Sequence, residues 1–363
     1  DGLLSGETMS IHIWDQSSEL EYANVDVTYI QGNGIYSSNS FHVIGSLDLN
    51  DVISQDITLN TGWNMISSYV IPEAPNLWTM FDSMTSNMIL MKNGQGQVFW
   101  PAYFINQIGN WNRVHGYQIY MLNNQTLTIT GAQAVPENTP ITLNAGWNLV
   151  SYLRGTPMPI DQALTTITGQ FLLVKDNAGR VYWPAYFINQ IGNMQPGQGY
   201  QIYMVSGAVL TYPANSVLAL SHSDYTPVID PDHFTTCQTR TGNNATLVLA
   251  GENLGLEIND GYELVSGDEI AVFNETGTVC VGVVKVAATE APITLTVWGD
   301  NEQTEMRDGL LPGEAMQFRV WSQSTDKETD ASTDFHVGDG LYEPDSWHIR
   351  FAELYQTFLP IVK

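Results

Sequence analysis

Two tandem copies of one sequence module constrain the fold of this chain more than any other feature. The first copy opens at Ile57 with ITLNTGWN, and the second opens at Ile141 with ITLNAGWN. The segment WPAYFINQIGN occurs unchanged at residues 100–110 and 183–193. Both copies then continue to the segment GYQIYM. We therefore expect the same fold twice, over about 80 residues each time.

A second self-match joins the two ends of the chain. DGLLSGE at residues 1–7 matches DGLLPGE at 308–314, and GNGIY at 32–36 matches GDGLY at 338–342. The last part of a C-terminal domain is thus repeated at the N-terminus without its earlier part. This predicts five parts, listed here with the names used below: the N-terminal segment (1–50, a half β-sandwich lacking its first half), module 1 (51–138), module 2 (139–222), the sandwich (223–352, complete) and an extended C-terminal tail (353–363).

Local patterns predict a mainly β fold. Apolar residues alternate after each GWN motif, as expected for half-buried strands. Residues 75–81 and 159–164 begin with proline and carry apolar residues at helical spacing, which predicts one short helix per module. Turn residues predict hairpins at 91–98 and 174–181. The fold class is therefore antiparallel β-sandwich modules together with two mostly β repeats that contain a short helix each.

Composition excludes several partners. The chain of 363 residues carries 38 acidic against 12 basic side chains, a formal net charge of −26. Such a field repels phosphate backbones and anionic lipid headgroups, so we expect no nucleic-acid partner. No apolar stretch reaches the ~18 residues of a spanning helix, so we expect no membrane insertion. The chain begins at Asp1 without a leader, which favours a mature form or a fragment.

The motifs resemble modules of large secreted and cell-surface proteins of Bacteroidetes and related phyla. The pattern GDEI at 267–270, CVG at 280–282, WGD at 298–300, DG at 308–309 and GE at 313–314 resembles one of their β-sandwiches. The GWNMIS and GWNLVS segments of the tandem modules resemble another of their repeats. The resemblance implies a secreted, extracellular or cell-surface location. Those families carry no established enzymatic role.

The sequence offers no catalytic motif. Its seven histidines have no paired metal-ligand spacing, and no nucleophile elbow or phosphate-binding loop is present. We therefore expect a protein that is not an enzyme. We also expect no cofactor, and Ca²⁺ is the one candidate to consider. Asp300, Asn301, Asp308 and Glu314 could supply oxygen ligands to Ca²⁺, or could be ordinary solvated loop residues. Cys237 and Cys280 could form a disulfide, or Cys280 could be a small buried residue on a strand.

Aromatic residues recur in both modules and allow two interpretations. Trp100 and Tyr103, with their copies Trp183 and Tyr186, could stack on sugar rings and make glycans a partner. Large aromatics more often form the core, and the sequence favours that interpretation.

An uncompleted half sandwich would leave an open strand edge and an apolar face. The segment could be cut from a longer array, packed on module 1, or completed by another copy through strand addition. The proposed acceptor residues are Ile11, Ile13, Trp14, Val25 and Val27, and the proposed donor residues in the tail are Tyr355, Phe358, Leu359, Ile361 and Val362. The leading hypothesis is a structural subunit of an extracellular filament or surface layer that assembles head-to-tail with itself. The alternative is an adhesin or glycan-binding module of a larger secreted protein.

Overall fold

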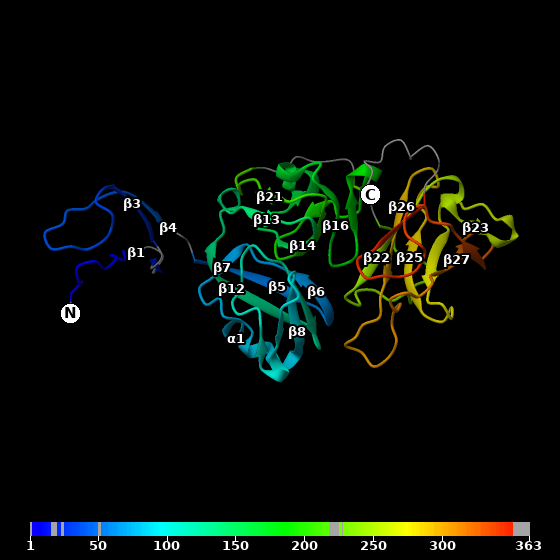
Figure 1. Ribbon diagram of the computed structural model, residues 1–363, viewed down its shortest axis with the longest axis horizontal. Coiled ribbons are helices and arrows are strands. Elements are labelled where there is room, and N and C mark those ends of the chain that lie inside the picture. Colours follow the sequence, from blue (N-terminus) through cyan, green and yellow to red (C-terminus); the bar gives the residue numbers. More distant parts are fainter. Residues whose placement is uncertain are drawn as a thin grey trace.

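The computed structural model describes residues 2–15, 20–22, 25–49, 52–217, 225–226 and 228–350. Figure 1 shows three bodies in a row: the N-terminal segment at one end, the two modules together in the middle, and the sandwich at the other end. The fold is mainly β, with short helices only, as the sequence predicts. Strand pairing is antiparallel throughout the described sheets except between β22 and β29.

Module 1 consists of two sheets and one short helix. The five-stranded sheet has the order β10 (Ile105–Asn106), β9 (Val98–Trp100), β8 (Met88–Asn93), β11 (Tyr117–Met121) and β6 (Gly62–Ile66). The three-stranded sheet has the order β5 (Val52–Leu59), β12 (Gln125–Gln133) and β7 (Val70–Pro72). The helix α1 (Leu77–Met80) is capped by Asn76, whose side chain accepts the N–H of Trp78. Leu59, Phe81, Phe99 and Ile119 lie in the core of this module.

Module 2 repeats this strand order. Its five-stranded sheet runs β18 (Ile188–Asn189), β17 (Val181–Trp183), β16 (Phe171–Lys175), β20 (Gly199–Met204) and β14 (Gly146–Ser151). Two short pairs complete it: β13 (Ile141–Leu143) with β21 (Ala208–Leu210), and β15 (Met158–Pro159) with β19 (Asn193–Met194). The predicted short helix is α2 (Ile160–Ala163).

The two modules meet along a seam with two-fold pseudosymmetry. The N–H of Ser67 donates to the carbonyl of Gly197 at 2.9 Å, and the N–H of the matching Ser151 donates to the carbonyl of Val114 at 3.3 Å. Gly197 of module 2 is the counterpart of Val114 of module 1, so in each bond the matching serine of one module donates to the matching carbonyl of the other. The modules are therefore paired face to face like the halves of an isologous dimer.

The sandwich packs a three-stranded sheet on a five-stranded sheet. The first has the order β26 (Ile293–Trp298), β22 (Asn244–Leu249) and β29 (Trp347–Arg350). The second has the order β23 (Glu257–Ile258), β28 (Lys327–Ser332), β27 (Gln317–Ser322), β24 (Glu269–Phe273) and β25 (Cys280–Lys285). Leu247, Ile270, Leu295 and Val320 belong to the core between them.

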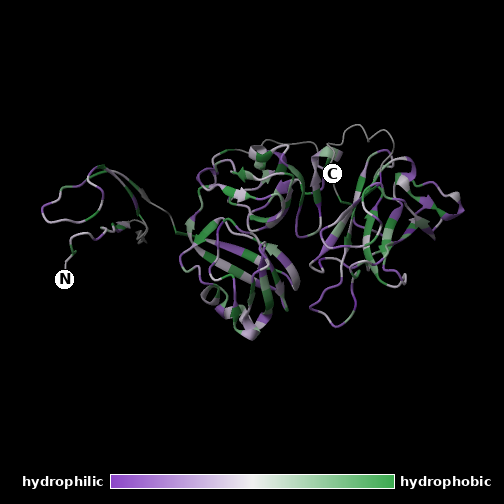
Figure 2. Ribbon diagram, viewed as in Figure 1, coloured by the Kyte–Doolittle hydropathy of each residue, from purple (hydrophilic) through white to green (hydrophobic). Residues whose placement is uncertain are grey.

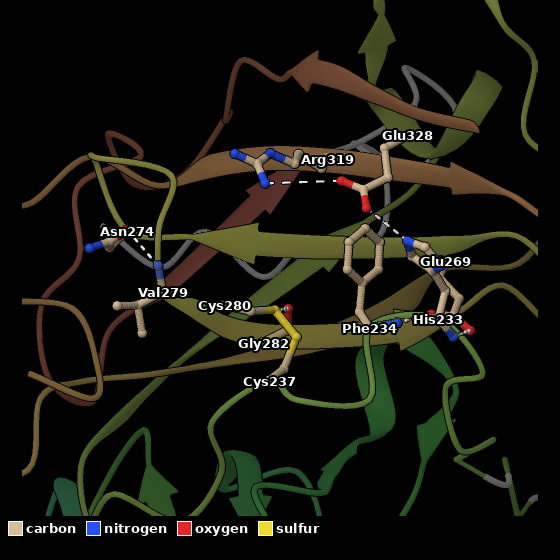
Figure 3. The surroundings of a disulfide bond; sticks show 10 residues. All are labelled: His233, Phe234, Cys237, Glu269, Asn274, Val279, Cys280, Gly282, Arg319 and Glu328. Atoms are coloured by element: carbon tan, nitrogen blue, oxygen red, sulfur yellow. Dashed lines mark hydrogen bonds and ion pairs between the residues drawn. A yellow bond between two sulfur atoms is a disulfide. The ribbon is translucent and has the colours of Figure 1, made fainter. Parts of the chain in front are cut away.

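The segment that leads into the sandwich is fastened to the five-stranded sheet (Figure 3). Cys237 forms a disulfide with Cys280 on β25. Phe234 packs among Phe273, Trp321 and neighbouring apolar residues. The buried carboxylate of Glu269 accepts the N–H of His233 at 3.1 Å and that of Phe234 at 2.9 Å. These contacts fix residues 233–237 on the sheet.

The three-stranded sheet of the sandwich docks on module 2. Trp347 of β29 packs on Tyr203 with ring centroids 4.7 Å apart, and Val248 and Ile349 join a buried cluster with Trp183 and Tyr186. This docking extends the core across the boundary between two domains.

The N-terminal segment contains two separate strand pairs. β1 (Ile13–Asp15) pairs with β2 (Leu20–Tyr22), and β3 (Val25–Gln31) pairs with β4 (Val43–Leu49). Neither pair has a further neighbour among the described strands. Figure 2 shows hydrophobic residues along this segment, with no second layer over them.

Candidate assembly interface

The N-terminal segment reproduces several contacts of the second half of the sandwich. Thr8 bridges Ile35 just as Ala315 bridges Leu341. The end of the hairpin matches as well, because Gln31 lies opposite Val43 in the register that pairs Val337 with Ile349. The sequence similarity between the two ends of the chain therefore reflects a shared backbone structure.

One histidine anchors the turn in each copy. The N–H of Gly34 donates to Nδ1 of His42 at 3.3 Å, and the N–H of Gly340 donates to Nδ1 of His348 at the same distance. Burial lowers the pKa of His348 from its usual value, which favours the neutral ring that accepts this bond. Sequence reasoning assigned no role to these histidines, although their place after the matching GNGIY and GDGLY segments was the available signal.

In the sandwich, the equivalent strands have neighbours on both sides. β29 runs parallel to β22, and β27 is flanked by β24 as well as by β28. Within the described residues, no strand takes the place of β22 beside β4 or of β24 beside β1. The backbone groups on these two edges of the N-terminal segment are therefore available for pairing.

The exposure of side chains in the N-terminal segment can be compared with that of the matching side chains in the complete sandwich. Leu310 is fully buried, whereas its counterpart Leu3 is 47% exposed. Trp321 is 8% exposed because His233 stacks on it and Phe234 packs beside it, whereas its counterpart Trp14 is 60% exposed. Further exposed apolar side chains of this segment are Ile30, Phe41, Ile44 and Leu47. Leu4 and Ile35 are exposed too, but their counterparts Leu311 and Leu341 stay exposed in the complete sandwich.

The proposed acceptor residues lie on this uncovered surface. Ile13 and Trp14 belong to β1, Val25 and Val27 belong to β3, and Ile11 precedes β1. All but Trp14 are half-buried, so their local hairpins cover them only in part. The proposed donor residues Tyr355, Phe358, Leu359, Ile361 and Val362 lie outside the described residues.

The four residues that could supply ligands to Ca²⁺ brace one loop between β26 and β27. Asp300 Oδ1 accepts the N–H of Asp308 at 2.8 Å, and Asp308 Oδ1 accepts the N–H of Asn301 at 2.9 Å. Asn301 also accepts the indole N–H of Trp63 at 3.3 Å, which ties the loop to module 1. In the described part of the chain, no group of three or more His, Cys, Asp and Glu side chains is arranged to hold a metal ion.

Glu314 has a similar bracing role. It accepts backbone N–H groups from Leu311 and Glu275, both at 2.9 Å, and pairs with Arg307. Burial acts to raise the pKa of this carboxyl, but the hydrogen bonds and Arg307 outweigh it and hold the pKa below its usual value. The calcium site is left without geometric support.

The repeated aromatic residues have different surroundings in the two modules. Trp183 and Tyr186 are buried beneath the sandwich, which leaves no face open to a sugar ring. Trp100 is half-buried and Tyr103 is 65% exposed, with their rings edge to face at 4.7 Å. The sequence-based preference for a core role therefore describes module 2 but not module 1.

The fold and this site define a modular, mainly β protein whose N-terminal segment has open strand edges among the described residues. No family model matches the chain, and no curated protein matches it. Among solved structures, it is similar to the adhesin domain of Epf from Streptococcus pyogenes, with 10% sequence identity over 83% of this chain and 72% of that chain. The TM-score of 0.16 is too low for this likeness to bear on fold or function. In the described residues no helix is long and apolar enough to cross a membrane.

Proposed function

We propose that this chain is a non-enzymatic structural subunit of an extracellular filament or surface layer. In this proposal, strands from another copy complete the sandwich that begins in the N-terminal segment. The observation that carries it is the contrast between Leu3 and Leu310, which occupy the same position in two copies of one structure but differ from 47% to 0% in exposure.

The hydrophobic effect favours such completion. Burying a large apolar side chain contributes about 1.5–3 kcal/mol, and Leu3 would change from exposed to covered, as its counterpart Leu310 is in the sandwich. Association costs rotational and translational freedom, so several such side chains are needed together. The exposed apolar residues of the N-terminal segment meet that need.

The sandwich indicates which strands a donor has to replace. A strand beside β4 would run parallel to it, as β22 runs beside β29. A strand beside β1 would run antiparallel, as β24 runs beside β27. The C-terminal tail, residues 353–363, is apolar and long enough for one such strand of ~5–6 residues. We assign it the position beside β4.

The extracellular location is supported by the Cys237–Cys280 disulfide, which is of the kind that persists in oxidising compartments.

Concentration-dependent assembly tests the proposal. We expect sedimentation velocity and negative-stain microscopy of the purified chain to show head-to-tail oligomers that lengthen with concentration. Hydrogen exchange should slow at the amides of β1 and β4 as oligomers form, because those edges become paired. Deleting residues 355–363 should leave folded monomers, and oligomers that persist after this deletion would remove the tail from the donor role.

Leu3→Ser provides the matched side-chain test, with Phe187→Ser as its control. Both residues are large and exposed, but Phe187 lies in module 2, away from the acceptor surface. We expect the first variant to shift the chain to monomers and the second to leave assembly unchanged. A chain that stays monomeric at all concentrations, with rapid exchange in β1 and β4, would contradict the proposal.

A further inference from the structure

Module 2 carries an open groove that the assembly proposal does not use. The groove has a volume of about 750 Å³ and lies between α2 and the sheet strands β16, β17 and β20. Its walls include the half-buried rings of Phe171, Tyr182 and Tyr203, and Asp161 lies at the α2 side. This volume is within the range of small-ligand sites, which combine apolar walls with a few polar groups.

The equivalent place in module 1 is occupied by a side chain of the module itself. α1 and α2 start at matched positions, because the N–H of Leu77 bonds to Gly109 and the N–H of Ile160 bonds to the matching Gly192. The next residue is Trp78 in module 1 and Asp161 in module 2.

Trp78 packs its indole edge to face on Phe99, the counterpart of Tyr182, with centroids 4.8 Å apart. In module 2 the shorter Asp161 replaces this indole, Phe171 packs beside Tyr182 with ring centroids 6.0 Å apart, and the groove next to them stays open. Trp78 acts as an internal stand-in that shows the size of a ring in this position.

The groove in module 2 differs from an ordinary apolar cavity by its carboxylate. The C–H face of a pyranose ring packs well against the electron-rich face of an aromatic ring. A carboxylate is a strong acceptor for hydroxyl donors at the edge of the same ring. Aromatic walls and one carboxylate thus suit a ligand that is apolar on its face and hydroxylated at its rim.

From this arrangement we infer that the groove of module 2 binds one sugar ring of a glycan, in the position that Trp78 fills in module 1. Tyr182 stacks on the ring, and Asp161 accepts a hydroxyl hydrogen bond. The site is distinct from Trp183 and Tyr186, which the sandwich covers. It is also independent of strand completion, because none of its residues belongs to the N-terminal segment or to the tail.

An array of neutral and acidic oligosaccharides, probed with the whole purified chain, tests the inference. We expect binding to a subset of the array. Tyr182→Ala should weaken that binding about tenfold in titrations with the best array oligosaccharide, since one ring stacking interaction is lost. Asp161→Trp should abolish it by filling the groove as Trp78 does. Tyr103→Ala in module 1 is the matched control and should leave binding unchanged.

The converse variant, Trp78→Asp, should open a second groove and raise the binding stoichiometry from one to two. Circular dichroism of each variant separates lost binding from lost fold. A silent array overturns the inference, as does binding that survives Asp161→Trp or is removed by Tyr103→Ala. Oligomer formation is measured separately, so failure here leaves the assembly proposal standing, and the reverse also holds.

Discussion

The Nζ atom of Lys175 lies 2.9 Å from Oδ1 of Asn244, and this hydrogen bond joins module 2 to the sandwich where no solvent reaches. The ammonium also lies over the ring of Trp147, at 5.0 Å from its centroid. Burial lowers the pKa of Lys175 to about 8, although the nearby Asp345 acts in the opposite direction. The docked sandwich therefore holds a cation whose charged form is destabilised by its surroundings.

This lysine makes stability depend on pH in a predictable direction. The pKa is lower in the folded chain than its value of about 10.4 in an unfolded one, so between pH 8 and about 10 the unfolded state binds more protons. The free energy of unfolding should rise with pH across this window, by up to about 3 kcal/mol. In Lys175→Met, chemical denaturation at a series of pH values should show no such rise.

Lys92 is the natural control, because it is the counterpart of Lys175 in module 1 and is only half-buried. Burial lowers its pKa too, with Glu302 and Asp345 opposing the shift. We expect Lys92→Met to keep most of the pH dependence. An unchanged rise in Lys175→Met would show that the charged lysine is not the cause.

Buried tyrosines should destabilise the fold at higher pH. Burial raises the pKa of Tyr117 to about 12, although its backbone hydrogen bond to Asn112 lowers it. Burial also raises the pKa above its usual value for Tyr152, Tyr186, Tyr200, Tyr212 and Tyr342.

Above about pH 10 the unfolded state loses phenolic protons that the folded state keeps, so stability falls as pH rises further. The tyrosinate absorbance of these buried residues should therefore appear only together with unfolding. A single smooth titration near pH 10, without coupling to unfolding, would contradict this account.

The repeats made much of the fold predictable, because they fix local structure. Hairpins, GWN strands and short helices form in both modules, where apolar spacing and turn residues determine them. Contacts between domains were not predictable in this way. Trp100 and Trp183 stand in identical eleven-residue segments, yet only Trp183 is buried under the sandwich. Identical local sequence cannot reveal a difference that a distant domain imposes.

The candidate calcium loop and the groove could not be predicted from the sequence for a similar reason. Asp300 and Asp308 have a ligand-like spacing, but their oxygens accept backbone N–H groups of the same loop, which only the folded loop reveals. The groove in module 2 was hidden because Pro75 and Pro159 suggest an alignment of the helices that is shifted by one residue. The hydrogen bonds to Gly109 and Gly192 correct it and bring Trp78 opposite Asp161.

The disulfide should stabilise the sandwich and its leading segment together. Cys237 and Cys280 are 43 residues apart, so the bond restricts a long loop of the unfolded chain. Replacing both by serine should lower the free energy of unfolding by about 2–4 kcal/mol. Reduction of the unaltered chain should lower the melting temperature similarly and leave the serine variant unaffected. Equal effects of reductant on both proteins would point to another cause.

Removing the buried carboxylate of Glu269 should destabilise the segment it holds more than removing a surface carboxylate would. Its buried side chain accepts the backbone N–H groups of His233 and Phe234, which place Phe234 on the sheet. Glu269→Ala leaves those donors unpaired in an apolar setting, at a cost of about 1.5–3 kcal/mol for each charge-assisted bond. Protease cleavage between residues 228 and 236 should become faster as this segment detaches.

Glu269→Gln separates charge from shape at the same site. Its amide oxygen still accepts one N–H, so we expect thermal stability between that of the parent chain and that of Glu269→Ala. Glu263→Ala removes an exposed carboxylate of the same domain and should change stability by less than about 0.5 kcal/mol. If Glu269→Ala and Glu263→Ala melt alike, with equal cleavage rates, the carboxylate does not hold the segment, and the disulfide and Phe234 alone fasten it to the sheet.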